Sequence, residues 1–362
     1  MSRWLWRAAW LLLPAAWLSH RFLHRDAVTF FVACASLIPL AKAMGDATEA
    51  LAGRMGPAAG SLLNATFGNA AELILGISAL RHGHVDLVKG SITGSILGNL
   101  LLVGGVSIVV GGARFSRLRF NRLAASSSTA TLFLAVVALA VPTILSVSRN
   151  PRYNPGLLSE EISVVLVVMY ALSLWFGLRT HREQMASERE HVAATPAEAA
   201  AERAATPPAH APLWFDLGRL LLAAAATALA SELLVDALGG AVTTLHLPET
   251  FVGVIIVAIV GNAAEHSTAL LFARRGEMDV ALGIAWESSK QIALLVAPVL
   301  VFCGIALGVP MDLAFTRFEV VSVGLSVLAL SMIALDGETH WLEGAFLLAV
   351  YAVLGMGFFF VG

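Results

Sequence analysis

The stretch 68-GNAAELILGISAL-80 returns 193 residues later as 261-GNAAEHSTALLFA-273. Both copies lie inside long apolar runs, and each motif ends in a carboxylate, Glu72 in the first and Glu265 in the second. An ionisable side chain in the apolar interior of a bilayer is costly and marks a functional position. We therefore asked what class of protein carries this pair, and what the two carboxylates bind.

The composition indicates a polytopic membrane protein. Of the 362 residues, 58% are hydrophobic and 13% charged, whereas a soluble domain has about a quarter charged residues. A net charge of −2 without a basic stripe gives no support for a nucleic-acid partner. Eleven apolar segments approach the ~20 residues that cross a bilayer. They lie near 4–20, 27–45, 57–81, 85–111, 123–147, 158–179, 213–238, 249–273, 279–308, 312–335 and 340–361.

The charge distribution predicts the orientation in the lipid bilayer. The first segment has a basic start and could be a signal peptide, but no clear small-residue cleavage site follows it, so a span is favoured. Alternating spans place 15 of the 23 Lys and Arg residues on the side of the N-terminus and seven on the other, with Lys290 inside a span. The positive-inside rule then predicts a cytoplasmic N-terminus and an external C-terminus. The compact chain suggests a bacterial inner membrane.

The chain divides into similar halves. We predict a leading helix at 1–22, a first five-span repeat at 27–180, a cytoplasmic connector at 181–212 and a second five-span repeat at 213–362. The connector is polar and Pro-rich, so it is either a solvated linker or a regulatory segment. The first GNAAE lies in the third span and the second in the eighth, so the two copies cross the membrane in opposite directions. Such inverted repeats in transporters place the ion site near the midplane.

The repeated motif offers oxygen ligands. In helical geometry Asn69 and Glu72 lie on one face, as do Asn262 and Glu265, with His266 on the same side. The glycine that opens each motif, Gly68 or Gly261, permits close helix contact or a local break that frees backbone carbonyls. Carboxylate, amide and carbonyl oxygens suit a hard cation such as Ca²⁺. Alternatively, each glutamate merely forms a hydrogen bond across a helix interface.

The spans that follow each motif add hydroxyl and amide groups. These are Ser91, Ser95 and Asn99 in the fourth span and Ser288, Ser289 and Gln291 in the ninth. They are candidates for cation ligands, for supports of those ligands, or for interhelical hydrogen bonds. Gly94 and Gly98 are spaced for close helix packing. Glu49 and Glu232 occupy matching places in the two halves, at a mouth of the pathway or in ion pairs, and Asp46 is expected at the membrane interface.

Two buried carboxylates have the thermodynamics of an exchanger. Removal from water favours the protonated form of a carboxyl group, whereas a bound divalent cation favours the ionised form. The same two groups can thus hold either one cation or protons. If Glu72 and Glu265 carry the exchange, about two protons per divalent cation is the minimum stoichiometry.

These residues resemble the cation/proton exchanger branch of the cation/Ca²⁺ antiporter superfamily. The resemblance runs through 39-PLAKAMGDATEALAGRMGPAAGSLLNATFGNAAELILG-76, 94-GSILGNLLLVGG-105, 253-GVIIVAIVGNAAEHSTAL-270 and 291-QIALLVAP-298. It implies an all-α membrane protein of eleven helices, one leading helix plus two inverted five-helix repeats, that exports Ca²⁺ in exchange for H⁺. It also implies that the two essential acidic residues are Glu72 and Glu265, with Asn69 and Asn262 as the motif asparagines. His266 is the motif histidine, a candidate for proton coupling together with the two glutamates.

The ninth span departs from that family. Where relatives usually have a Gly-Ser-Ser-x-Gln-Ile run, this chain has 287-ESSKQI-292. Glu287 and Lys290 are three residues apart, so an intrahelical ion pair is the simpler interpretation. Alternatively, the pair reaches the ion path and modifies cation selectivity.

Two other transport functions are alternatives to proton-coupled Ca²⁺ antiport. The chain could exchange Na⁺, K⁺ or Mn²⁺ against H⁺ or Na⁺, or conduct Ca²⁺ as a channel. No H-E-x-x-H, Walker A or G-x-S-x-G motif occurs, so an enzyme is unsupported and no cofactor is expected. The oligomeric state is left open.

Overall fold

The computed structural model describes residues 3–55, 60, 63, 66–147, 153–180 and 212–361. This part of the chain is almost entirely helical, as predicted. Its only strands are the two-residue β1 (Leu118–Arg119) and β2 (Glu338–Thr339), which pair antiparallel. The predicted connector 181–212 lies outside the described residues except for Pro212.

The helices follow the apolar segments. The first half contains α1 (Arg3–Leu18) with the π-helical turn η1 (Ser19–Leu23), α2 (Asp26–Ala52), α4 (Ala70–Arg81), α5 (Val85–Leu97) continuing through η2 (Gly98–Val103) into α6 (Gly104–Gly112), α7 (Arg122–Val147), and α8 (Pro155–Trp175) with η3 (Phe176–Thr180). The second half contains α11 (Leu213–Leu245), α12 (Glu249–Phe251) continuing through η5 (Val252–Val257) into α13 (Ala258–Gly261), α14 (Ala263–Arg274), α15 (Met278–Gln291) continuing through η6 (Ile292–Val296) into α16 (Ala297–Leu307), α17 (Arg317–Ile333) and α18 (Trp341–Val361).

Within the described residues, seven helices are long and apolar enough to cross a membrane, and eight if one bent pair is counted. The bent pair joins Glu249–Gly261 to Ala263–Arg274 at 59°. The helices α1 and α17, of 16 and 17 residues, are not among these seven, and α1 continues through η1 to Leu23. The predicted span 57–81 is described in part, and its described helix is α4.

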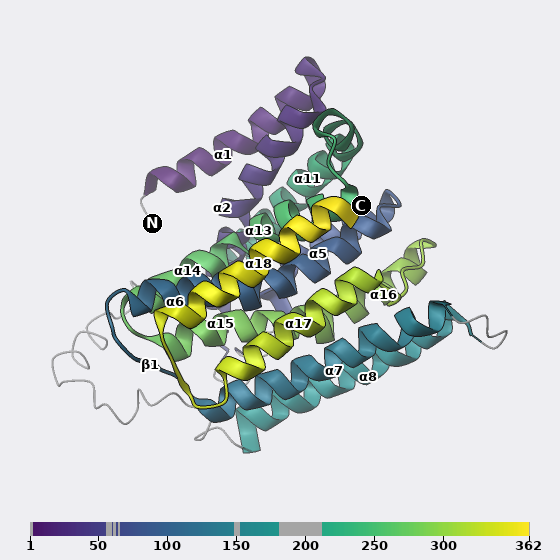
Figure 1. The fold of residues 1–362 in the computed structure, drawn as a ribbon. Helices are drawn as coiled ribbons and strands as arrows, with labels where there is room; N and C mark the ends of the chain where they lie inside the picture. Colours follow the sequence, from purple (N-terminus) through teal and green to yellow (C-terminus); the bar gives the residue numbers. More distant parts are fainter. Residues whose placement is uncertain are drawn as a thin grey trace.

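The two halves match in local structure and in packing. The turns after α4 and α14 each contain a left-handed glycine, Gly83 and Gly276, both at φ 81°, and the π-helical turns η2 and η6 occupy corresponding places. Packing is reciprocal, because α4 contacts α16 as α14 contacts α6, and α8 contacts α16 as α18 contacts α6. Figure 1 shows α1 and α2 at one end of the molecule and α7 and α8 side by side at the other.

The interhelical links gather at two faces. Face A carries the links 112–122, 274–278 and 333–341, and face B carries 81–85, 245–249 and 307–317. On face A, β1 pairs with β2, and Arg114 donates to the carbonyl of Arg274. On face B, Lys89 Nζ donates to Asp312 Oδ1 at 2.5 Å and to the carbonyl of Ala314 at 2.8 Å. Helices that alternate between the two faces can place side chains from both halves at the centre.

Glycines permit the closest helix contact. The faces of α5 and η5 meet at Gly94, where an added Cβ would overlap the backbone of Val254, and at Gly90, where it would lie 3.0 Å from the carbonyl of Thr250. Close packing at Gly94 is therefore confirmed. The same expectation is wrong for Gly98, because an added Cβ there meets nothing within 4 Å.

Candidate ion-binding site

Each GNAAE motif lies at a break in its helix. Asn69 precedes α4 with φ −103° and ψ 26°, and Asn262 separates α13 from α14 with φ −92° and ψ 5°. The local break allowed by the sequence is thus present in the second motif, one residue after Gly261. The first motif has the same conformation at its asparagine. Both asparagines begin a helix, and Glu72 and Glu265 lie in its first turn. The helix dipole there interacts favourably with negative charge.

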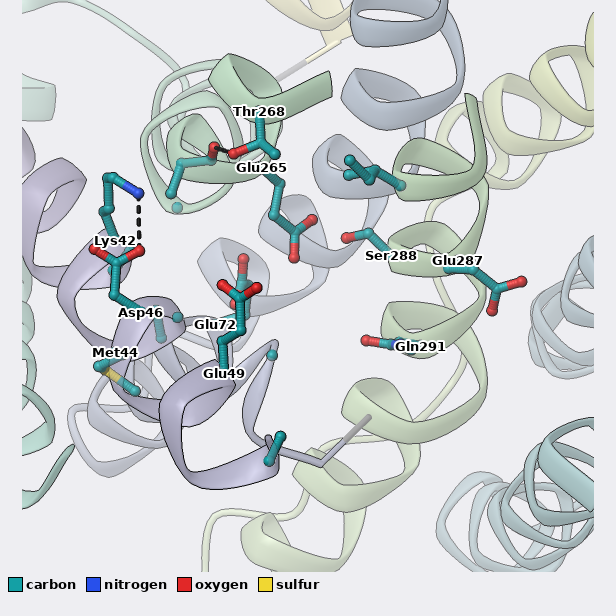
Figure 2. A pocket seen from close by; sticks show the side chains of 18 of the residues that line it. Lys42, Met44, Asp46, Glu49, Glu72, Glu265, Thr268, Glu287, Ser288 and Gln291 are labelled. Atoms are coloured by element: carbon teal, nitrogen blue, oxygen red, sulfur yellow. Dashed lines mark hydrogen bonds and ion pairs between the residues drawn. The ribbon is translucent and has the colours of Figure 1, made fainter. Parts of the chain in front are cut away.

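The two glutamates face a shared cavity of about 870 Å³. Glu72 and Gly68 line it from the first motif, and Glu265 and Gly261 line it from the second. Figure 2 shows both carboxylates pointing into the same space, with Ser288 and Gln291 of α15 opposite them. The C-terminal part of α2 completes the wall, so the cavity extends from the glutamates toward face A.

The carboxylates are close and incompletely satisfied. A Cβ added to Gly261 would lie 3.8 Å from Oε1 of Glu72, so the first glutamate reaches the backbone of the opposite motif. The Oε2 atoms of Glu72 and Glu265 are buried and have no hydrogen-bond partner. A buried carboxylate oxygen without a partner is expensive unless a proton or a cation occupies it.

The asparagine of the second motif belongs to a buried polar network. Asn262 Nδ2 donates to Ser95 Oγ at 2.9 Å, and Asn99 Nδ2 donates to Ser288 Oγ at 2.9 Å. His266 Nε2 lies 3.1 Å from Asn99 Oδ1. Since that oxygen accepts, this nitrogen carries a proton. The network holds Ser288, which also contacts Glu265, in place beside the cavity.

The asparagine of the first motif has a different partner. Asn69 Nδ2 donates to Gln291 Oε1, and Asn69 Oδ1 is buried without a partner. Ser289, also predicted at the site, is buried and donates to the carbonyl of Ala285 in its own helix at 2.9 Å. It does not line the cavity, whereas Ser288 does. Ser95 lines a small neighbouring cavity together with Glu72.

The side chains at the cavity offer oxygen ligands. These suit a hard cation better than a metal that needs several acidic or soft side chains. Among the described residues, no group of three or more His, Cys, Asp or Glu side chains could hold a metal ion. A cation between Glu72 and Glu265 would therefore take its other ligands from amide, hydroxyl and carbonyl oxygens. Asn69 Oδ1 is one such unpartnered oxygen. This is the ligand type that Ca²⁺ accepts.

Glu287 and Lys290 form the predicted intrahelical ion pair. The Lys290 side chain is 5% exposed, whereas that of Glu287 is 54% exposed and lines the cavity. In Figure 2 the Glu287 carboxylate points away from Glu72 and Glu265. Of the two residues that depart from the family pattern, Glu287 thus reaches the cavity wall and Lys290 is buried.

Some lining residues were not expected at the cavity from the sequence. Asp46, expected at the membrane interface, lines the cavity and pairs with Lys42 at 2.8 Å. Glu49 also lines the cavity. Thr268, one turn after Glu265, was not singled out, although its spacing from Glu265 places it on the same helical face.

The chain is similar to several known proteins. A family model described as "Sodium/calcium exchanger protein" matches residues 26–179 and 215–360. The chain is 43% identical over 354 residues to a Ca²⁺/H⁺ antiporter of Aphanothece halophytica, covering 97% of this chain and 95% of the relative. It is 42% identical over 338 residues to the Ca²⁺/H⁺ antiporter ChaA of Bacillus subtilis strain 168, covering 92% of each. The solved structure of native YfkE superposes with a TM-score of 0.80 at 37% identity, covering 98% of this chain and all of that one.

Proposed function

The chain belongs to the sodium/calcium exchanger protein family, and we propose that it is a Ca²⁺/H⁺ antiporter whose Glu72 and Glu265 bind either Ca²⁺ or protons. One observation carries the proposal. Two carboxylates from opposite motifs face one cavity, and each has a buried oxygen without a partner. A cation satisfies both oxygens at once, and protons satisfy them separately.

We propose that the fold is one leading helix plus two inverted five-helix repeats, eleven helices in all. The matched left-handed glycines Gly83 and Gly276 support this repeat, as does the reciprocal packing of α4 on α16 and α14 on α6. The repeats extend over 27–180 and 213–362. An inverted repeat makes alternating access natural, since each half can adopt the arrangement of the other.

The predicted orientation assigns face A to the cytoplasm. Arg114, Arg117, Arg119 and Arg122 lie on or next to the face A link 112–122. The cavity extends from the glutamates toward this face, so Ca²⁺ would enter from the cytoplasm of a bacterial cell and leave at face B. Protons would travel the opposite way and complete the cycle.

The charged residues of the cavity wall favour a second candidate function, the exchange of a cation other than Ca²⁺. Glu287 is an additional acidic group at the cavity, with Lys290 buried behind it. This arrangement changes the charge near the ion path and favours testing Na⁺, K⁺ and Mn²⁺ beside Ca²⁺. Selectivity measured with Glu287→Gly/Lys290→Thr decides between an ion pair that serves stability and one that shapes cation choice.

The proposal is tested by ⁴⁵Ca²⁺ uptake into sealed proteoliposomes under an imposed ΔpH. We expect uptake that requires the proton gradient and is lost in Glu72→Gln and in Glu265→Gln. Glu343→Gln removes the same charge at a residue outside the cavity and serves as the matched control. Uptake without a counter-ion gradient would indicate a channel, and full activity in both glutamine variants would overturn the assignment.

A further inference from the structure

The two mouths of the pathway differ in this structure. Glu49 of α2 and Glu232 of α11 lie in matching sequence contexts, 48-TEAL-51 and 231-SELL-234. Glu49 lines the cavity on the side of face A. Glu232 instead forms ion pairs at face B with the end of α4. Equivalent positions thus mark one open mouth and one closed mouth.

Three contacts hold α11 against the end of α4 at the closed mouth. Arg81 lies 3.4 Å from Glu232 Oε1, and His82 Nε2 lies 3.6 Å from Glu232 Oε2 and 3.3 Å from Asp236 Oδ1. The four side chains are one third to three fifths exposed, so each contact by itself is weak. Together they join two helices that pack against each other, and we call these four residues the face B cluster.

The two nitrogens of the His82 ring face different partners. Its Nδ1 lies 2.9 Å from the carbonyl of Ser78, which only accepts, and its Nε2 lies within 4 Å of two carboxylates. Nδ1 therefore donates to the carbonyl, and a proton on Nε2 would pair with both carboxylates. The charged groups at this end of α4, α5, α11 and α12 are Arg81, Asp86, Glu232, Asp236 and Glu249, the last held by His84 at 3.0 Å. Without a proton on Nε2, Glu232 keeps only its contact with Arg81.

The corresponding residues at the open mouth have no histidine. The turn after α14 reads 274-RRGE-277 where the turn after α4 reads 81-RHGH-84, so Arg275 stands in the place of His82. On α2 the counterpart of Asp236 is Gly53. In the described part of the chain, no ion pair joins Glu49 to Arg274 or Arg275. A histidine is therefore present at the face B mouth, and an arginine takes its place at the face A mouth.

We propose that Arg81 and His82 are positioning residues of the transport cycle, which with Glu232 and Asp236 keep face B closed in a proton-dependent way. The inference rests on the proposed function, since it assumes that face B opens during transport. An acidic solution at face B strengthens the face B cluster and holds the mouth closed. A neutral or alkaline solution releases it. The mouth at face A, with Arg275 in that place, has no such dependence.

A probe position lies behind the face B cluster. Two small cavities of about 10 Å³ each adjoin Glu72, and Ser91 lines both of them but not the large cavity. Each has about the volume of a single water molecule. A cysteine at Ser91 is expected to become accessible from face B only when that mouth opens. The two native cysteines are free and can be replaced.

The experiment measures labelling of Ser91→Cys, in a Cys34→Ala/Cys303→Ala background, by a membrane-impermeant maleimide added at face B. Full-length protein in sealed vesicles is used, with rates corrected for the thiolate fraction by means of a cysteine at the exposed Thr244, near the face B end of α11. We expect labelling to rise about fivefold between about pH 5.5 and about pH 7.5, the range in which histidines titrate. His82→Arg, which copies the open mouth, should stay slow at both pH values, and His82→Gln should be fast at both.

Each outcome bears on the proposal. A corrected rate that does not change with pH, or an equal rise in parent and His82→Arg, overturns it. Arg81→Gln and Glu232→Gln should both raise the rate at acidic pH, and size-exclusion profiles confirm that the variants are folded. Because labelling needs neither Ca²⁺ nor a gradient, a negative Ca²⁺ uptake assay with a positive labelling result would reject the proposed cargo and leave the face B cluster standing.

Discussion

Oε1 of Glu72 lies 3.8 Å from the point where a Cβ on Gly261 would stand, so the acidic residue of one motif abuts the first residue of the other. That separation is an ordinary van der Waals contact, and Gly261→Ala should therefore retain most Ca²⁺ uptake. Gly261→Leu adds a side chain at the carboxylate and should reduce uptake at least about tenfold by displacing it. Uptake into proteoliposomes measures both. Gly239→Leu, on α11 with open space around it, is the control, and an unimpaired Gly261→Leu would contradict the shared site.

Ser288 and Ser289 are adjacent but have different surroundings. Ser288 lines the cavity and accepts from Asn99, whereas Ser289 donates within its own helix. Ser288→Ala should weaken the apparent Ca²⁺ affinity about three- to tenfold, on the order of 1 kcal/mol. Ser289→Ala should change it by less than about twofold. Titration of uptake rate against Ca²⁺ concentration tests the pair, and equal effects would show that this side of α15 is misassigned.

Glu287 and Lys290 should differ in their contribution to stability. Glu287→Gln leaves a nearly buried ammonium without its partner, which should cost about 1–2 kcal/mol and lower the thermal midpoint. Lys290→Leu leaves a carboxylate that is already half exposed to the cavity, and should cost less. Thermal unfolding in detergent distinguishes them. The order would be reversed if Glu287, rather than Lys290, were the buried member.

Gly94 and Gly98 provide a matched pair for the packing of α5. Gly94→Ala pushes a methyl group into the backbone of Val254 and should destabilise the fold by about 1–3 kcal/mol. Gly98→Ala meets open space and should be neutral or slightly stabilising. Monodispersity and thermal midpoint of the purified variants report the difference. Similar behaviour of the two variants would argue against the close contact of α5 with η5.

The sequence was sufficient for the features that follow from periodicity and repetition. The duplicated GNAAE motif and the apolar segments predict a helical membrane protein, and Glu72 and Glu265 line one cavity, as an inverted repeat would be expected to place them. Counting spans cannot show that Asn69 and Asn262 stand at helix breaks. The sequence is apolar on both sides of each break. Packing against the surrounding helices therefore determines which backbone hydrogen bonds of the helix are lost.

The sequence also could not predict which groups each polar side chain contacts in the folded protein. Glu49 and Glu232 have matching sequence contexts, yet one lines the cavity and the other is ion-paired at face B. Ser288 and Ser289 are chemically identical and differ only in helical direction. Asp46 and Lys42 form a local pair within α2, and only the packing of α2 against the two motifs brings Asp46 to the cavity. Such differences arise from tertiary packing and from the conformation that the transporter adopts.

The central claim is that the same two carboxylates hold either protons or Ca²⁺. It is tested most directly by isothermal titration of the purified protein with Ca²⁺ in buffers of different ionisation enthalpy, which counts the protons released. The account predicts release approaching about two protons per Ca²⁺ at acidic to neutral pH, falling to about one in Glu72→Gln or Glu265→Gln wherever binding is still measurable. Tight Ca²⁺ binding with no proton release at any pH in this range would contradict it.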